Sequence, residues 1–244
     1  MSSTQSSTQL IIEHFYLGII MTAVYIIASP LLIEHGYPSF AALLLIEVAV
    51  LAPIVALHLA YLARSNGGTG SFAALIPYRR KAKTSHFITW SLLGIALIVG
   101  FYIVLYPLGL ELRETVFSWL PEWYFNPSYG AQSLETLAMV FLAGIVIDGL
   151  IGPIAEELFF RGYLLSRMEH LKGWAPIING AFFGLYHFWQ PHNLIALVII
   201  GIILSYIVWK TKNVYIAIVV HCAINIFGAV GGYLAVTSGI EIAR

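Results

Sequence analysis

Long runs of apolar residues, separated by short polar stretches, make up most of the 244-residue sequence. A helix needs about 20 mainly apolar residues to cross a bilayer. We predict membrane-spanning helices for five runs, in which the only acidic, basic or histidine residues are Glu47, His58 and His221. The five runs are Phe15–Ile33, Phe40–Ala63, Phe87–Leu110, Leu194–Trp209 and Val214–Ile240.

Two further apolar segments lie between the third and fourth of these runs. Leu134–Met168 is long but interrupted by polar residues, and we predict one span that is kinked near Gly152 and Pro153. Trp174–Trp189 is shorter and is predicted as another span. The sequence therefore predicts an all-α, polytopic transmembrane helical bundle of about seven spans.

The composition supports a membrane protein and excludes other classes. Hydrophobic residues make up 59% of the chain and charged residues 10%, with a mean hydropathy of +0.86. Soluble domains carry about 25% charged residues, so a soluble globular protein is excluded. The 12 basic and 12 acidic residues give no net charge, and without a basic face the chain is not expected to bind nucleic acid. The lipid bilayer is the expected surrounding.

Basic residues gather in alternate loops and predict the orientation in the membrane. Short loops rich in Lys and Arg stay on the cytoplasmic side. The loops after the second, fourth and sixth predicted spans hold Arg64, Arg79, Arg80, Lys81, Lys83, Arg167, Lys172, Lys210 and Lys212. The opposite loops contribute only Arg113. We therefore predict an integral, multi-pass protein with its N-terminus inside, residues 1–9 as a cytosolic tail, and its C-terminus outside.

Ionisable side chains within a bilayer are costly, so each is a candidate for function. Glu157 and Arg161 are four residues apart on one helix face, a spacing that predicts an ion pair. Glu156 points about 100° away from Glu157 and has no local partner. Glu47 and Asp148 are interpreted either as interhelical hydrogen-bond partners or as lining access to a site.

Four polar residues on three spans fall in one layer of the membrane. Glu156, His187, His221 and Asn225 lie about 13–20 Å from the cytoplasmic ends of their spans, at 1.5 Å per residue. A glutamate and a histidine can take a proton from water, and a second histidine with an asparagine can donate hydrogen bonds to an oxyanion. Such a site, opening toward the cytosol, suits hydrolysis of an amide bond.

Other hydrolytic chemistries find less support in the sequence. No GxSxG or HExxH string occurs, which argues against a serine nucleophile and against a zincin. Glu156, His187 and His221 could instead ligate zinc with one position left open. The favoured interpretation requires no cofactor, and zinc is the alternative.

Three short strings together resemble a known family. EELFFRG at Glu156–Gly162 matches EExxxR, FGLYH at Phe183–His187 matches FxxxH, and HCAIN at His221–Asn225 matches HxxxN. In this order they resemble the CPBP family of intramembrane proteases, which includes the CAAX prenyl endopeptidase of the Ras-converting type and bacterial Abi-type proteins.

The resemblance implies an intramembrane endopeptidase and a role for each motif residue. Glu156 and His187 would activate water, and His221 and Asn225 would form the oxyanion site. Three supporting residues follow from the same motifs: Glu157, Arg161 and Phe183. The implied substrate is a membrane-embedded or membrane-anchored protein or peptide, including a prenylated CAAX-type protein.

The chain is accordingly divided into three parts. Residues 1–133 form three spans with the cytosolic basic loop, the flexible stretch 65–74 and an outer amphipathic segment, Phe117–Phe125. Residues 134–236 form the protease-like catalytic core, and 237–244 a short C-terminal tail. Small residues in the last three spans predict close helix packing: Gly180, Ala181, Gly184, Gly201, Gly228, Gly231 and Gly232.

Two functions of other classes remain open at this stage. A non-enzymatic scaffold or immunity-type protein could use the same fold to bind a partner. A proton-coupled carrier could use Glu156 and His187 as a relay, although the sequence shows no internal repeat.

Overall fold

The computed structural model describes residues 7–65 and 72–238. Within these residues, six helices are long and apolar enough to cross a membrane. The predicted tail at 1–9, the stretch 65–74 and the tail at 237–244 lie wholly or mostly outside the described residues. The six candidate spans are Thr8–Glu34, Ser39–Ser65, Thr84–Thr115, Leu134–Arg167, Pro191–Thr211 and Val214–Thr237.

Helices α1 (Ser7–Glu34), α5 (Thr84–Thr115), α10 (Leu194–Thr211) and α11 (Val214–Thr237) are continuous. The second span joins α2 (Ser39–Ile46), a π-helical segment η1 (Glu47–Leu51) and α3 (Ala52–Ser65). The fourth span joins α6, η3, α7, η4 and α8, which run Leu134–Val146, Ile147–Ile151, Gly152–Glu156, Glu157–Leu164 and Leu165–Arg167. Shorter elements are α4 (Phe72–Leu75), η2 (Glu122–Tyr124), η5 (Glu169–Trp174) and η6 (Pro191–Asn193).

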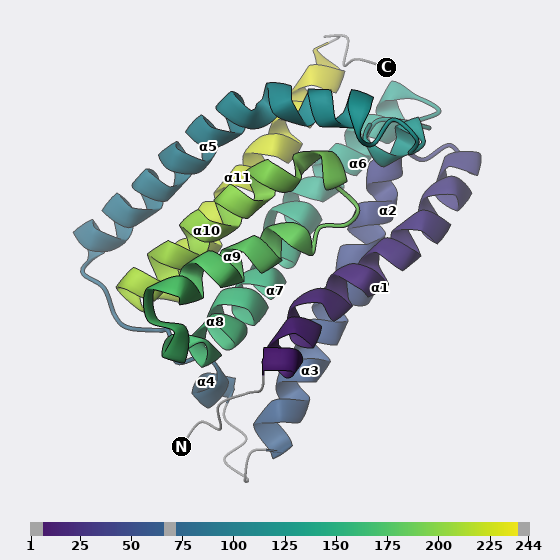
Figure 1. Ribbon diagram of the computed structural model, residues 1–244. Coiled ribbons are helices and arrows are strands. Elements are labelled where there is room, and N and C mark those ends of the chain that lie inside the picture. The colour runs from purple at the N-terminus through teal and green to yellow at the C-terminus, as the bar shows by residue number, and fades with distance from the viewer. Residues whose placement is uncertain (1–6, 66–71, 239–244) are drawn as a thin grey trace.

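The predicted all-α bundle is confirmed for the described residues, and the span count differs by one. Helix α9 covers only Ala175–Leu185, about 17 Å at 1.5 Å per residue, and is too short to cross a bilayer alone. In Figure 1, α9 rises part of the way through the bundle, and the non-helical connection after it reaches the end where α10 begins. Helix α1 therefore starts, and α11 ends, at opposite ends of the bundle.

The fourth span carries two π-helical stretches around the residues predicted to kink. Segment η3 ends directly before Gly152 and Pro153, and η4 starts at Glu157. Gly152 is needed for close packing, because a Cβ atom there would lie 2.9 Å from the carboxyl carbon of Glu47 on the second span. Single π turns occur often at functional sites.

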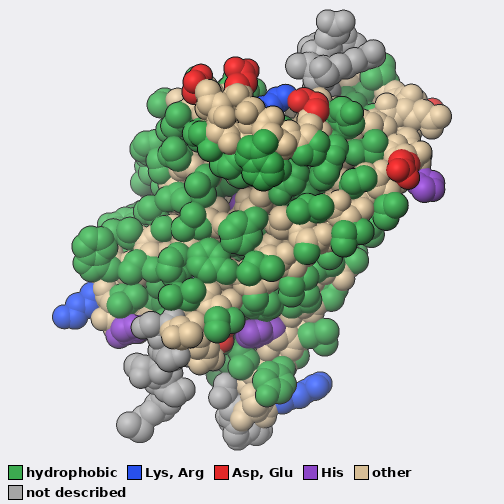
Figure 2. All heavy atoms as spheres, turned by 45° about the vertical axis from the view of Figure 1, so that its right-hand side comes forward, with side chains coloured by type: hydrophobic (Ala, Val, Ile, Leu, Met, Phe, Trp, Pro, Cys, Tyr) green, Lys and Arg blue, Asp and Glu red, His purple; other side chains and the backbone are tan. Residues whose placement is uncertain are grey.

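Apolar side chains cover the sides of the bundle and charged groups lie at its ends. Figure 2 shows a broad green belt of hydrophobic side chains, with acidic and basic side chains above and below it. Leu57 and Val104, for example, are 70% and 73% exposed, which suits contact with lipid and not with water. The chain is an integral membrane protein.

Helices α9 and α10 cross with their backbones in close contact. A Cβ atom at Gly180 would collide with the backbone of Gly201 and Ile202, and one at Gly184 with Val198. The predicted packing role is confirmed at these positions. It is wrong at Gly228 and Gly231, where a Cβ atom would meet nothing within 4 Å; Gly228 borders the cavity described below.

Candidate active site

Glu156, the last residue of α7, is contacted by side chains from the end of α9 and from α11. Its carboxylate accepts a hydrogen bond at Oε1 from the Tyr186 hydroxyl. His187 Nε2 lies 3.9 Å from Oε1, and His221 Nε2 lies 3.8 Å from Oε2. The structure thus brings together the carboxylate and both histidines that the sequence placed in one layer.

His187 is fixed with one nitrogen directed at Glu156. Its Nδ1 lies 2.7 Å from the Phe183 carbonyl oxygen, which can only accept, so the Nδ1 proton is donated there and Nε2 is left facing the carboxylate. The rings of Phe183, Tyr186 and Trp189 pack around it, at 4.4–4.9 Å between centroids. This arrangement sets the tautomer in which neutral His187 can accept a proton at Nε2.

Glu157, the second glutamate of the motif, forms a hydrogen bond with His221. The predicted ion pair is confirmed: Arg161 Nη1 lies 2.8 Å from Glu157 Oε1, and both side chains are fully buried. The same oxygen accepts from His221 Nδ1 at 2.9 Å. The Arg161 guanidinium lies 3.8 Å from the centre of the Phe183 ring. Glu157 therefore orients His221 while Arg161 neutralises its charge.

Asn225 lies one turn from His221 but has its own partner. Its amide nitrogen donates to the backbone oxygen of Asp148 at 3.0 Å, and lies 3.4 Å from the Asp148 carboxylate. The interhelical hydrogen bond weighed for Asp148 is confirmed. Glu47 lies beside Asp148 and is buried against Gly152.

Three residues near the site had no motif to mark them. Tyr186 is the tyrosine before His187 in FGLYH, and its hydroxyl is the direct partner of Glu156. Ser205 accepts from Arg161 Nε at 3.3 Å and donates to Asn179 at 2.9 Å. The only sequence signal for Ser205 and Asn179 is a polar side chain in an apolar helix.

The zinc alternative requires Glu156, His187 and His221 to act as ligands. Within residues 7–65 and 72–238, no three His, Cys, Asp or Glu side chains are grouped so that they could hold a metal ion. Glu157 takes up the second nitrogen of His221, and because zinc-bound histidines commonly make the same bond to a carboxylate, this contact is compatible with zinc as well as with a metal-free site. We derive no step through a metal.

A cavity of about 710 Å³ reaches the site. This volume is within the range of about 300–1,000 Å³ typical of ligand pockets. Asp148, His187, His221 and Asn225 line its inner part, and α5 forms one wall. Its outer part is lined by Arg113, Phe125, Gln190, His192 and Asn193. Among the residues that the structure describes, none that lines the cavity belongs to the basic loops, although the sequence predicts access from that side.

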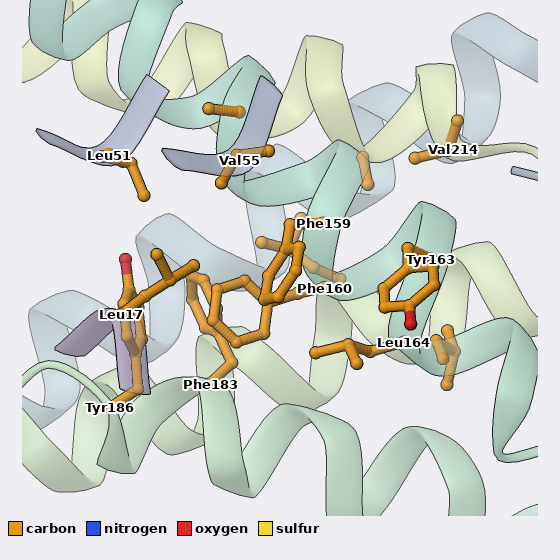
Figure 3. Close-up of a cluster of buried hydrophobic side chains, with 14 of the residues drawn as sticks. Leu17, Leu51, Val55, Phe159, Phe160, Tyr163, Leu164, Phe183, Tyr186 and Val214 are labelled. Carbon is orange, nitrogen blue, oxygen red and sulfur yellow. The ribbon is translucent and has the colours of Figure 1, made fainter. Parts of the chain in front are cut away.

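Behind the site, tightly packed rings fill the bundle toward the basic end. Phe159, Phe160, Tyr163 and Leu164 from η4 are each at most 1% exposed. Figure 3 shows them packed with Phe183 and Tyr186 from the α9 region and with side chains of neighbouring helices. This cluster separates the site from the basic loops.

Comparison with known proteins agrees with the motifs. A family model described as Type II CAAX prenyl endopeptidase Rce1-like matches residues 135–227. The family resemblance is confirmed. The matched segment contains all three motifs and lies within the region 134–236, whose boundaries remain a prediction.

Curated relatives match over part of their length. The UPF0177 protein YxdF of Lactococcus lactis is 31% identical over 95 residues, which cover 39% of this chain and 50% of that protein. The putative membrane peptidase YdiL of Bacillus subtilis is 24% identical over 134 residues, 53% of this chain and 52% of YdiL. The uncharacterized protein YyaK of Bacillus subtilis is 32% identical over 111 residues, 41% of this chain and 37% of YyaK. The chain thus spans about half or less of these relatives, and no solved structure matches it.

Proposed function

We propose that the protein is an intramembrane endopeptidase that hydrolyses a peptide bond with a water molecule activated by Glu156. The observation that carries the proposal is the convergence of two imidazole Nε2 atoms, 3.8 and 3.9 Å from one buried carboxylate. Each separation is too long for a direct hydrogen bond, and a water molecule can bridge polar groups at such distances.

The proposed reaction begins with removal of a proton from water. Glu156 and His187 Nε2 are both placed to accept this proton, and the water oxygen then attacks the carbonyl carbon of the scissile bond. Tyr186 holds the carboxylate in place through its hydroxyl. When the tetrahedral intermediate collapses, the abstracted proton passes to the leaving amine, so one water is added across the broken bond.

The oxyanion is assigned to His221 and Asn225. His221 Nδ1 donates to Glu157, so an N–H at Nε2 for the substrate requires the ring to carry both protons. Asn225 lines the same cavity, with its amide held by Asp148. Hydrogen-bond donors fixed in advance in this way stabilise a charge that develops in the transition state.

The substrate is proposed to be a membrane-embedded or membrane-anchored protein or peptide. The matching family model is described as a CAAX prenyl endopeptidase, which supports a prenylated CAAX-type protein as one such substrate. The basic loops favour a cytosolic active site, whereas the cavity lining favours access from the opposite end. The labelling experiment described below decides between the two.

The test compares peptides in membranes that contain the wild type, Glu156→Gln, or no protein. Glu135→Gln is the matched control, because Glu135 is an exposed glutamate near the start of the same span. We expect new peptide termini, detected by mass spectrometry, with the wild type and the control, and none with Glu156→Gln at equal expression. The same termini with folded Glu156→Gln would overturn the proposal, and no glutamate-dependent product at all would favour a non-enzymatic scaffold.

A further inference from the structure

The cavity and the basic loops lie at opposite ends of the bundle. At the basic end, Arg80 N donates to the Lys212 carbonyl at 2.8 Å, and Lys212 Nζ lies 2.9 Å from Glu169. Tyr78 also donates to Glu169 at 2.7 Å, and Arg167 to the Leu75 carbonyl at 3.3 Å. The loops after α3, α8 and α10 are thus joined on one face, as the sequence predicts.

The outer part of the cavity belongs to the other face. Arg113, which lines it, pairs with Glu122 of η2 at 2.6 Å. In Figure 1 the end of α5, η2 and the start of α10 lie together at the end of the bundle remote from α4 and α8. Because basic loops stay in the cytoplasm, this end is assigned to the extracytoplasmic side.

Helix α5 forms the wall of the cavity between two close contacts. Toward the basic end, a Cβ atom at Gly94 would lie 2.9 Å from Ile207 of α10. Toward the other end, one at Gly109 would lie 3.2 Å from the Asn193 side chain. Between these contacts, Tyr102 and Tyr106 line the cavity. Helix α5 therefore packs closely against α10 near its first contact and against Asn193 near its second, and the stretch of α5 between these contacts borders space for a ligand.

We propose that the substrate enters from the extracytoplasmic end. This inference rests on the proposed peptidase function and specifies its substrate class: an extended peptide segment with large apolar side chains, presented at the outer surface of the membrane. The aromatic wall of Tyr102, Tyr106 and Trp189 would hold the apolar side chains. Gln190 and Asn193 at the outer end offer hydrogen bonds to the peptide backbone.

Cysteine labelling tests the direction of access without requiring activity. Cys222, the single cysteine, is first replaced by Ala. A cysteine is then introduced at Ile224, which lines the inner cavity next to Asn225. The probe is a small, negatively charged methanethiosulfonate reagent that does not cross membranes, applied to intact cells and to inverted vesicles. Leu197→Cys, on the α10 wall, is a second variant should Ile224→Cys fail to fold.

Three control positions define the sides and the background. Lys81→Cys marks the basic end and Glu114→Cys the opposite end, since both side chains are exposed. Val219→Cys is the matched control for Ile224 on α11, because Val219 is 42% exposed on the apolar surface and does not line the cavity. A thiol that faces lipid does not ionise and reacts poorly.

We expect Ile224→Cys to react in intact cells together with Glu114→Cys, whereas Lys81→Cys reacts only in inverted vesicles and Val219→Cys in neither. Reaction of both cavity cysteines from the Lys81 side, from both sides or from neither would overturn the inference. So would a Glu114→Cys that reacts only in inverted vesicles. These outcomes are independent of the peptide comparison with Glu156→Gln, so failure of the access inference is distinguishable from failure of the peptidase proposal.

Discussion

Replacing Arg161 by Ala should destabilise the protein strongly, because it leaves Glu157 without its cation. The two charged groups are 2.8 Å apart and fully buried. Removing one member of a buried ion pair costs about 3–5 kcal/mol, since the other charge stays in an apolar environment. At about 2–4 °C per kcal/mol for a chain of this size, the midpoint of thermal unfolding should fall by about 6–20 °C.

The assay is thermal unfolding of the detergent-purified protein, followed by far-UV circular dichroism. The matched control is the double variant Glu157→Gln/Arg161→Met, which removes both charges and keeps similar side-chain volumes. Replacing both members of a buried pair by uncharged groups is often close to neutral, so the double variant should lose much less than Arg161→Ala. Equal losses in the two variants would refute the argument that an uncompensated charge is the cause.

Three further predictions concern turnover, metal and packing. Asn225→Ala should lower turnover by about 100-fold or more, the effect of losing one oxyanion donor, while loss of its bond to Asp148 lowers the free energy of unfolding by only about 1 kcal/mol. The purified protein should be active without stoichiometric metal; elemental analysis that finds one zinc per chain, lost together with activity in His221→Ala, would contradict this. Gly180→Ala should reduce the folded yield measured by fluorescence-detected gel filtration, because its Cβ atom would collide with the α10 backbone. The control Gly231→Ala should not, because its Cβ atom would meet nothing within 4 Å. Equal yields of the two variants would show that the close packing is not required.

Most of the fold could be predicted because lipid imposes a simple pattern on the sequence. Long, mainly apolar runs identified the six long spans, and the grouping of basic loops at one end is confirmed in the structure. The end of α9 at Leu185 could not be predicted, since no proline or run of polar residues follows until Gln190. The two residues that follow this end, Tyr186 and His187, contact Glu156 of another helix, and such a contact leaves no local signal in the sequence.

The candidate site was predictable as a set of residues but not as a set of contacts. The i to i+4 spacing correctly predicted the Glu157–Arg161 pair, because that contact lies within one helical segment. The Asn225 bond to Asp148 joins two helices, and π-helical winding in η3 changes which side chains face α11. Spacing along an ordinary α-helix carries no information about either effect.

The two adjacent glutamates face different ring nitrogens of His221, which explains why a motif would need both. Glu157 Oε1 lies 2.9 Å from Nδ1 of His221, whereas Glu156 Oε2 lies 3.8 Å from Nε2 of the same ring. Glu157 is neutralised by Arg161 and is inaccessible, so it can orient the ring but cannot receive a proton from substrate water. Glu156 is paired with a neutral hydroxyl and lies 3.8–3.9 Å from two imidazole nitrogens. Two carboxylates of identical chemistry therefore have different roles. Glu157 is paired with a permanent cation, whereas Glu156 remains free to exchange a proton.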